Sequence, residues 1–143
     1  MMVDLEVDSD VEIPDQLDNK IINKIVKSIF NDFHIPFQHL NIIFVTDQYL
    51  KMLHRDYLDD NTLTDVITFD LTDEGNSLFG EIYLSSERAN AQAKLYSNSW
   101  LDELYRYIIH GVLHLCGMND VEEKDREHMR QKENEYLFKM TEI

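Results

Sequence analysis

The chain centres on one long apolar stretch, Ser99-Trp-Leu-Asp-Glu-Leu-Tyr-Arg-Tyr-Ile-Ile-His-Gly-Val-Leu-His-Leu-Cys-Gly-Met-Asn-Asp120. A serine with an acid three residues later is typical of a helix start, so we expect a helix from Ser99. Gly117 predicts its end, because a residue without a Cβ enters a left-handed turn freely. Between these points apolar side chains cover almost the whole circumference, which indicates a helix inside the core. They are Leu101, Leu104, Tyr105, Ile108, Ile109, Val112, Leu113, Leu115 and Cys116.

Two histidines interrupt this apolar helix. His110 and His114 are four residues apart, so their rings emerge on one face of the helix. Asp120 follows the predicted turn, where a reversed chain brings its carboxylate back toward the imidazoles. Zinc accepts two histidines and a carboxylate as ligands while keeping one position open. We therefore predict that His110, His114 and Asp120 bind one zinc ion.

The whole pattern, His-x-x-x-His-x-x-Gly-x-x-Asp, has the ligand spacing of the extended zinc-protease motif. Those proteases place a glutamate directly after the first histidine as general base, and this chain has Gly111 there. The pattern thus predicts the metal geometry without the base of a peptidase. For the histidine pair taken alone, the alternative is two buried imidazoles that only form hydrogen bonds to the backbone.

Length and charge limit the classes of protein that fit. The chain has 143 residues and a formal net charge of −15, and its length predicts one domain over residues 1–143. The charge repels nucleic acid and anionic membranes at long range, so a polyanionic substrate needs a local basic groove. We recognise no membrane span or secretory signal, and Cys116 is the single cysteine. We therefore expect a cytoplasmic protein with no disulfide and no membrane or DNA partner.

Alternating and helical apolar patterns divide the rest of the chain into further elements. The predicted strands are residues 2–8, 40–46, 64–70 and 79–84, and the last two form an antiparallel hairpin. Besides the histidine helix and a loop at residues 58–61, the predicted helices are residues 22–33, 47–57, 85–96 and about 121–140. This order predicts an α+β fold with a small, mixed four-stranded sheet, about five helices and a central metal-binding helix.

The histidine stretch resembles a known family. His110-Gly-Val-Leu-His-Leu-Cys-Gly-Met-Asn-Asp120 is similar to the signature of the YbeY endoribonuclease family, His-Gly-x-Leu-His-Leu-x-Gly-Tyr-Asp-His. Three further segments, 53–57, 64–69 and 80–85, also resemble family elements in the same order. The resemblance implies a zinc-binding α+β fold and a metal-dependent, single-strand-specific endoribonuclease. It further implies a role in 16S rRNA 3′-end maturation and ribosome quality control, with single-stranded rRNA and ribosomal particles as partners.

The sequence departs from that family pattern at two positions. Asp120 stands where the family has its third histidine, and His128 is the rival third ligand. Leu58 stands where the family has an arginine thought to engage RNA. Arg55 lies one turn earlier in the predicted helix, so we expect it to replace that arginine as a catalytic residue.

Three other charged residues are candidates for the site. Glu103 lies two turns before His110 on the same face. It is predicted to be a group that orients a histidine ligand, a base acting through water, or an exposed acid that the helix dipole stabilises. Asp65 is expected to orient a ligand or cap a loop, and Arg88 to contact phosphate. Two other functions stay open: a ribosome-associated assembly factor with a structural metal, and a metallopeptidase-like hydrolase, against which Gly111 argues.

Overall fold

The computed structural model of the chain describes residues 2–58 and 65–142. These residues form four strands and five helices, which confirms the predicted α+β fold. In chain order they are β1 (Met2–Val7), α1 (Asn19–Asp32), β2 (Phe37–Val45), α2 (Asp47–Leu58), β3 (Val66–Asp70), β4 (Leu78–Ser85), α3 (Ser86–Leu95), α4 (Trp100–Leu115) and α5 (Glu123–Met140). The predicted strand residue Thr64 and the predicted loop residues 59–61 lie outside the described residues.

The sheet is mixed, with the strand order β1-β2-β4-β3. β2 pairs in parallel with both β1 and β4, while β3 runs antiparallel to β4 from Val66 opposite Leu84 to Asp70 opposite Gly80. The predicted hairpin of the third and fourth strands is therefore confirmed. β2 begins at Phe37, three residues earlier than predicted, because Phe37 already pairs with Leu78 directly after Pro36.

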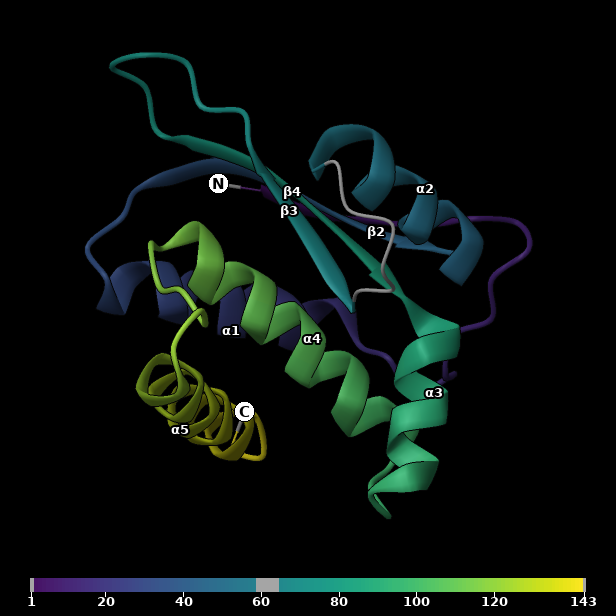
Figure 1. Cartoon of the computed structure of the whole chain (residues 1–143). Coiled ribbons are helices and arrows are strands. Elements are labelled where there is room, and N and C mark those ends of the chain that lie inside the picture. The colour runs from purple at the N-terminus through teal and green to yellow at the C-terminus, as the bar shows by residue number, and fades with distance from the viewer. Residues whose placement is uncertain (1, 59–64, 143) are drawn as a thin grey trace.

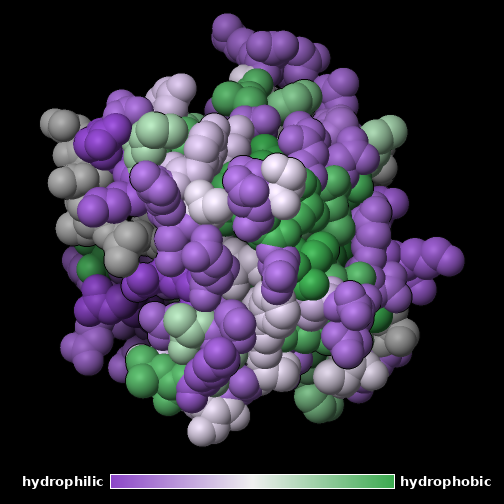
Figure 2. Space-filling model, turned by 90° about the vertical axis from the view of Figure 1, so that its right-hand side faces the viewer, coloured by the Kyte–Doolittle hydropathy of each residue, from purple (hydrophilic) through white to green (hydrophobic). Residues whose placement is uncertain are grey.

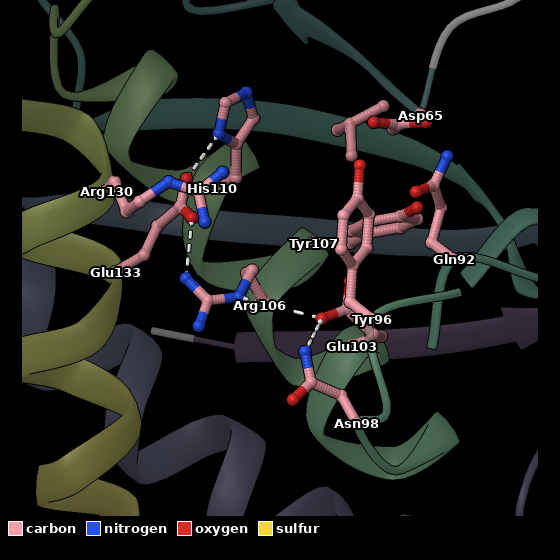
Figure 3. A pocket seen from close by; sticks show the side chains of 11 residues that line it. Asp65, Gln92, Tyr96, Asn98, Glu103, Arg106, Tyr107, His110, Arg130 and Glu133 are labelled. Carbon is pink, nitrogen blue, oxygen red and sulfur yellow. Dashed lines mark hydrogen bonds and ion pairs between the residues drawn. The ribbon is translucent and has the colours of Figure 1, made fainter. Parts of the chain in front are cut away.

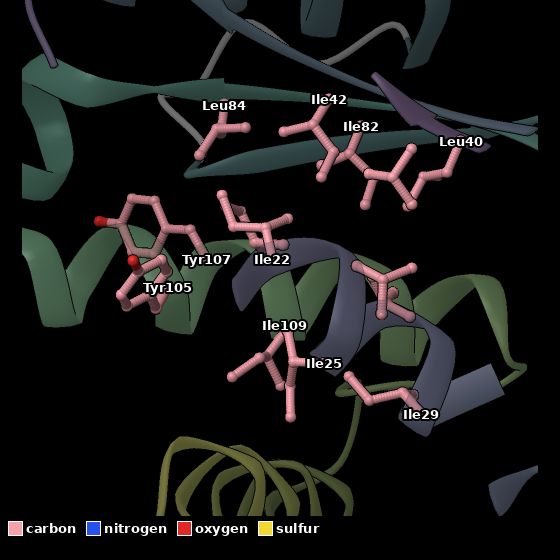
Figure 4. Packing of buried hydrophobic residues seen from close by; sticks show 14 of the residues in the cluster. Ile22, Ile25, Ile29, Leu40, Ile42, Ile82, Leu84, Tyr105, Tyr107 and Ile109 are labelled. Carbon is pink, nitrogen blue, oxygen red and sulfur yellow. The ribbon is translucent and has the colours of Figure 1, made fainter. Parts of the chain in front are cut away.

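The two faces of the sheet are covered unequally. α1 and α4 lie against one face and α5 packs on them from outside, whereas α2 lies on the opposite face (Figure 1). The face toward α1 and α4 carries the larger core, in which isoleucines of α1 meet every second residue of β2 and β4 (Figure 4). The face toward α2 buries only a small cluster, namely Val45, Leu50, Leu53 and Ile67.

The central helix α4 begins and ends as the sequence predicts. The Ser99 hydroxyl accepts a hydrogen bond from the Asp102 backbone N–H at 3.0 Å, which caps the first turn. At the other end Gly117 has φ +98°, and the N–H groups of Gly117 and Met118 donate to the carbonyls of His114 and Leu113. These two bonds form a Schellman motif, so the chain reverses directly after the second histidine.

α4 crosses the sheet at close range because of Gly111. A Cβ at this position would lie 2.9 Å from the side chain of Ile82 on β4. The glycine that replaces the protease glutamate thus has a packing role, since any larger side chain would push the helix away from the sheet.

The surface is largely hydrophilic. Figure 2 shows a face on which hydrophilic residues predominate, with smaller hydrophobic areas between them. Among the described residues, no helix is both long and apolar enough to cross a membrane.

Candidate metal centre

Three side chains converge directly after the C-terminal turn of α4. The Nε2 atoms of His110 and His114 are 2.9 Å apart. Oδ2 of Asp120 lies 3.4 Å from Nε2 of His110 and 3.6 Å from Nε2 of His114. Since Gly117 reverses the chain, the carboxylate that follows it meets the two imidazoles, as the spacing predicts.

This triangle has the size that one zinc ion requires. Tetrahedral zinc with Zn–N bonds of about 2.0–2.1 Å holds neighbouring ligand atoms roughly 3.3 Å apart. The three measured separations lie on both sides of that value. Ligand atoms from these same residues form a potential metal-binding group, whereas His128 lies exposed on α5 and is not in it.

Each imidazole is held by a hydrogen bond at its other nitrogen. Nδ1 of His114 donates to the backbone carbonyl of Met118 at 2.9 Å. Nδ1 of His110 lies 2.6 Å from Oε2 of Glu133 on α5. A neutral ring that donates from Nδ1 presents its lone pair on Nε2, so both rings are oriented for ligation at the shared point.

The environment of His114 favours the neutral form that a metal needs. Burial lowers the pKa of His114, and the neighbouring His110 lowers it further. Asp120 and the Met118 carbonyl act in the opposite direction but do not cancel this effect. Cys116, two residues on, is not part of the potential metal-binding group, and burial raises the pKa of its thiol to about 12.

Glu133 is the site residue that the sequence interpretation missed. The residue is only 6% exposed, and besides contacting His110 its carboxylate accepts a hydrogen bond from Nη1 of Arg106 at 3.0 Å. Burial alone would raise the pKa of Glu133, but His110 and Arg106 more than offset it and lower the pKa. The sequence did contain a signal, since Glu133 falls in the apolar stripe of α5 between Met129 and Tyr136. A carboxylate in such a stripe needs a charged or hydrogen-bonding partner.

The interpretation based on the helix dipole predicted an exposed Glu103, and this prediction is wrong. Glu103 is 7% exposed, because the chain before α4 folds over it and the Asn98 amide donates to its carboxylate at 3.1 Å. Its Oε1 also lies 3.8 Å from Nε of Arg106. Arg106 therefore connects Glu103 with Glu133, and the two carboxylates share the single positive charge of its guanidinium.

The other three residues predicted for the site, Asp65, Arg88 and Arg55, are placed differently relative to the histidines. Arg88 at the start of α3 donates from Nε to Asp65, which directly precedes β3, and this partner raises the pKa of Arg88. Arg55 lies on α2, on the opposite face of the sheet from α4, and forms an ion pair with Asp56 at 3.1 Å. The structure thus brings Asp65 and Arg88 together with each other but does not bring Arg55 to the histidines.

A polar pocket of about 500 Å³ adjoins the centre at His110. His110, Glu133 and Arg130 line one side, while Asp65 and Gln92 line the other (Figure 3). Tyr107 lies between the two sides, and its hydroxyl is the one buried side-chain polar atom without a hydrogen-bond partner in the described part of the chain. Leaving such a group unpaired costs about 1–3 kcal/mol, so this hydroxyl requires an explanation.

The fold and the cluster define a small α+β protein whose central helix carries a candidate metal site. A sequence model described as Endoribonuclease YbeY matches residues 5–141. Curated proteins named Endoribonuclease YbeY are 44% identical in Christiangramia forsetii and 45% identical in Flavobacterium johnsoniae, each over 98 residues. These alignments cover 68% of this chain and 68% and 70% of the respective relatives. The chain belongs to the YbeY endoribonuclease family.

A solved structure agrees with this assignment. The solution structure of TM1509 from Thermotoga maritima is 26% identical in sequence and superposes with a TM-score of 0.60. The match covers 97% of this chain and 89% of the other. The arrangement of strands and helices described above is therefore also found in an experimental structure.

Proposed function

We propose that this chain cleaves single-stranded rRNA with one zinc ion bound by His110, His114 and Asp120. Its family makes it an rRNA-processing endoribonuclease; the zinc ion, its ligands and the roles of the surrounding residues are our proposal. One domain over residues 1–143 would perform this reaction in the cytoplasm, on ribosomal particles during 16S rRNA 3′-end maturation. The observation that carries the proposal is the triangle of ligand atoms, with sides of 2.9, 3.4 and 3.6 Å.

A bound zinc ion lowers the pKa of a coordinated water toward neutrality and polarises a phosphoryl oxygen. The protein side chains hold this chemistry in place. His110 and His114 contribute neutral nitrogens, each fixed by its Nδ1 hydrogen bond. Asp120 would contribute a negative charge and remains partly exposed, so a metal ion held here would be accessible from solvent.

The charged residues near the centre have separable roles in this proposal. Arg106 pairs with both Glu133 and Glu103, so Glu103 positions Arg106 while remaining a candidate base only through an intervening water. Arg88, positioned by Asp65, is the phosphate contact on the side of β3. Arg55 lies on the opposite face of the sheet from the metal cluster, so it would contact the RNA at a distance from the cleaved bond. Its contribution would be to RNA binding.

Metal content and RNA cleavage test the proposal when both are measured on the same preparations. We expect wild type to bind one zinc per chain and to cleave single-stranded RNA, and His114→Ala to lose both. His128→Ala is the matched control, because it removes an exposed histidine of α5 that lies outside the cluster. It should keep both zinc and activity.

Three results would contradict the proposal. Loss of zinc in His128→Ala would make that residue the third ligand instead of Asp120. Equal cleavage by wild type and His114→Ala would point to a contaminating nuclease. Zinc binding without any His114-dependent cleavage would leave the alternative of an assembly factor with a structural metal, which the net charge of −15 favours because a protein partner could supply the affinity.

A further inference from the structure

The polar pocket beside His110 extends beyond the metal cluster. Its lining includes His110 but neither His114 nor Asp120. Its volume of about 500 Å³ falls in the usual range of small-molecule sites. We propose that this pocket binds one unstacked nucleobase of the RNA strand, next to the bond that is cleaved. This inference rests on the proposed function, since it places the strand at the metal centre.

The position of His110 connects the pocket with the reaction. The Nε2 atom of this ring belongs to the metal cluster, while its other nitrogen is held by Glu133 in the pocket wall. A phosphodiester bound at the cluster therefore has an adjacent nucleotide at the pocket entrance. An extended single strand offers its base there, whereas a duplex keeps its bases paired and stacked.

The charges of the pocket favour a neutral ligand over an anion. All three carboxylates in its wall are paired: Asp65 with Arg88, and Glu103 and Glu133 with Arg106. These pairs remove most of the repulsion that an acidic wall would exert on RNA. Arg130 adds a guanidinium that forms no ion pair within residues 2–58 and 65–142. A nucleobase fits this lining, because it is uncharged and polar at its edges.

Tyr96 offers an aromatic surface for stacking. It follows α3 directly and is 65% exposed although it lines the pocket. Ser97, with φ +58°, turns the chain at this point. Exposed aromatic rings beside a cationic group are the usual platform for single-stranded nucleic acid, and every base has a face that stacks on them.

Two unused polar groups can bind the edges of the base. The Gln92 amide, on the same helix as Arg88, forms no hydrogen bond with the residues that the structure describes. The buried Tyr107 hydroxyl also lacks a partner there and points toward the Asp65 end of the pocket (Figure 3). An amide donates and accepts at once, and a hydroxyl does the same, so the pair accepts more than one base. This predicts recognition of an unpaired base with little preference for its identity.

A cycle that changes protein and RNA together tests the inference. The cleaved bond of a short single-stranded oligoribonucleotide is mapped with zinc-loaded wild type, and abasic residues then replace each flanking nucleotide in turn. We expect one abasic position to lower kcat/KM by about 5- to 150-fold, the range for one lost base–aromatic stack. Tyr96→Ala should cause a loss of similar size on intact RNA and no further loss on that one abasic RNA.

Tyr107→Phe and Phe138→Ala complete the set of variants. Tyr107→Phe keeps the ring and should lower kcat/KM by about 2- to 13-fold, as expected for one hydrogen bond. Phe138→Ala removes an aromatic ring of α5 that is 67% exposed and does not line the pocket, so it should cleave at the wild-type rate. All variants are compared at equal zinc content.

Two outcomes would overturn the inference while the proposed function stands. In the first, Tyr96→Ala cleaves intact RNA at the same rate as Phe138→Ala. In the second, Tyr96→Ala lowers kcat/KM by the same factor on every abasic RNA as on intact RNA. If zinc-loaded wild type does not cleave RNA at all, the proposed function fails instead. Fluorescence anisotropy with the same intact and abasic oligoribonucleotides then tests the pocket alone, and equal affinities for all of them would overturn it.

Discussion

The surroundings of His110 and His114 differ although the two residues lie four positions apart on one helix. His114 is held by the Met118 carbonyl, which belongs to the turn that ends the same helix. His110 is held by the carboxylate of Glu133, which is 23 residues away on α5 and is itself paired with Arg106. One imidazole is thus oriented by local backbone geometry and the other by a buried ionic network. The two therefore respond to different mutations.

The largest expected effect concerns the network around His110. Glu133→Leu leaves Arg106 and His110 without their buried partner, and removing one member of a buried pair costs about 3–5 kcal/mol. The free energy of unfolding in urea, measured on metal-free protein, checks this value. Glu135→Leu is the matched control, because Glu135 pairs with Lys132 at the surface and should cost about 1 kcal/mol or less. Equal losses in the two variants would show that the network contributes nothing.

The second prediction tests how Glu133 orients His110, separately from its effect on stability. Glu133→Gln keeps the size of the side chain but weakens the bond that orients His110, so zinc affinity should fall about 10- to 100-fold. Competition with a chromogenic chelator measures the dissociation constant. Met118→Leu should leave that constant unchanged, because His114 uses only the backbone carbonyl of this residue. Unchanged zinc affinity in Glu133→Gln would mean that the carboxylate does not support the ligand.

A third change acts on the His114 side. Gly117→Ala places a Cβ on a left-handed residue, with an expected loss of about 1–2 kcal/mol in unfolding free energy. Since this turn positions both the Met118 carbonyl and Asp120, zinc affinity should fall as well. Gly75→Ala introduces the same strain at φ +81° in a turn outside the cluster. It should cost similar stability with no change in zinc affinity, and a parallel loss of affinity would count against local control of His114.

The smallest effect is a dependence of stability on pH. The pKa of His114 is lowered in the folded state, so the unfolded chain binds more protons below the ordinary histidine pKa of about 6.5. The unfolding free energy of metal-free protein should therefore decrease as the pH falls through that range. The unfolding free energy of metal-free His114→Gln should decrease less over the same pH interval. If both proteins lose stability equally, the burial of this imidazole has no effect on stability.

The local half of the site could be predicted because its causes are close in sequence. Ser99 caps α4, Gly117 ends it, and the spacing of His110 and His114 places both rings on one face. These features depend on backbone geometry within a few residues. The burial of Glu103 was more difficult to predict, because its position in the first turn indicates exposure and only the packing of the preceding chain buries it.

The amino-acid sequence by itself therefore determined the elements of the fold, the hairpin of β3 and β4, and the ligand spacing on α4. Periodicity and turn chemistry are properties of neighbouring residues. Only the tertiary structure decided that Glu133 supports His110, that Arg88 is engaged by Asp65, and that Arg55 lies on the opposite face of the sheet. These outcomes depend on which surfaces of distant helices pack together. Packing of that kind follows from the whole core and cannot be inferred from any single segment.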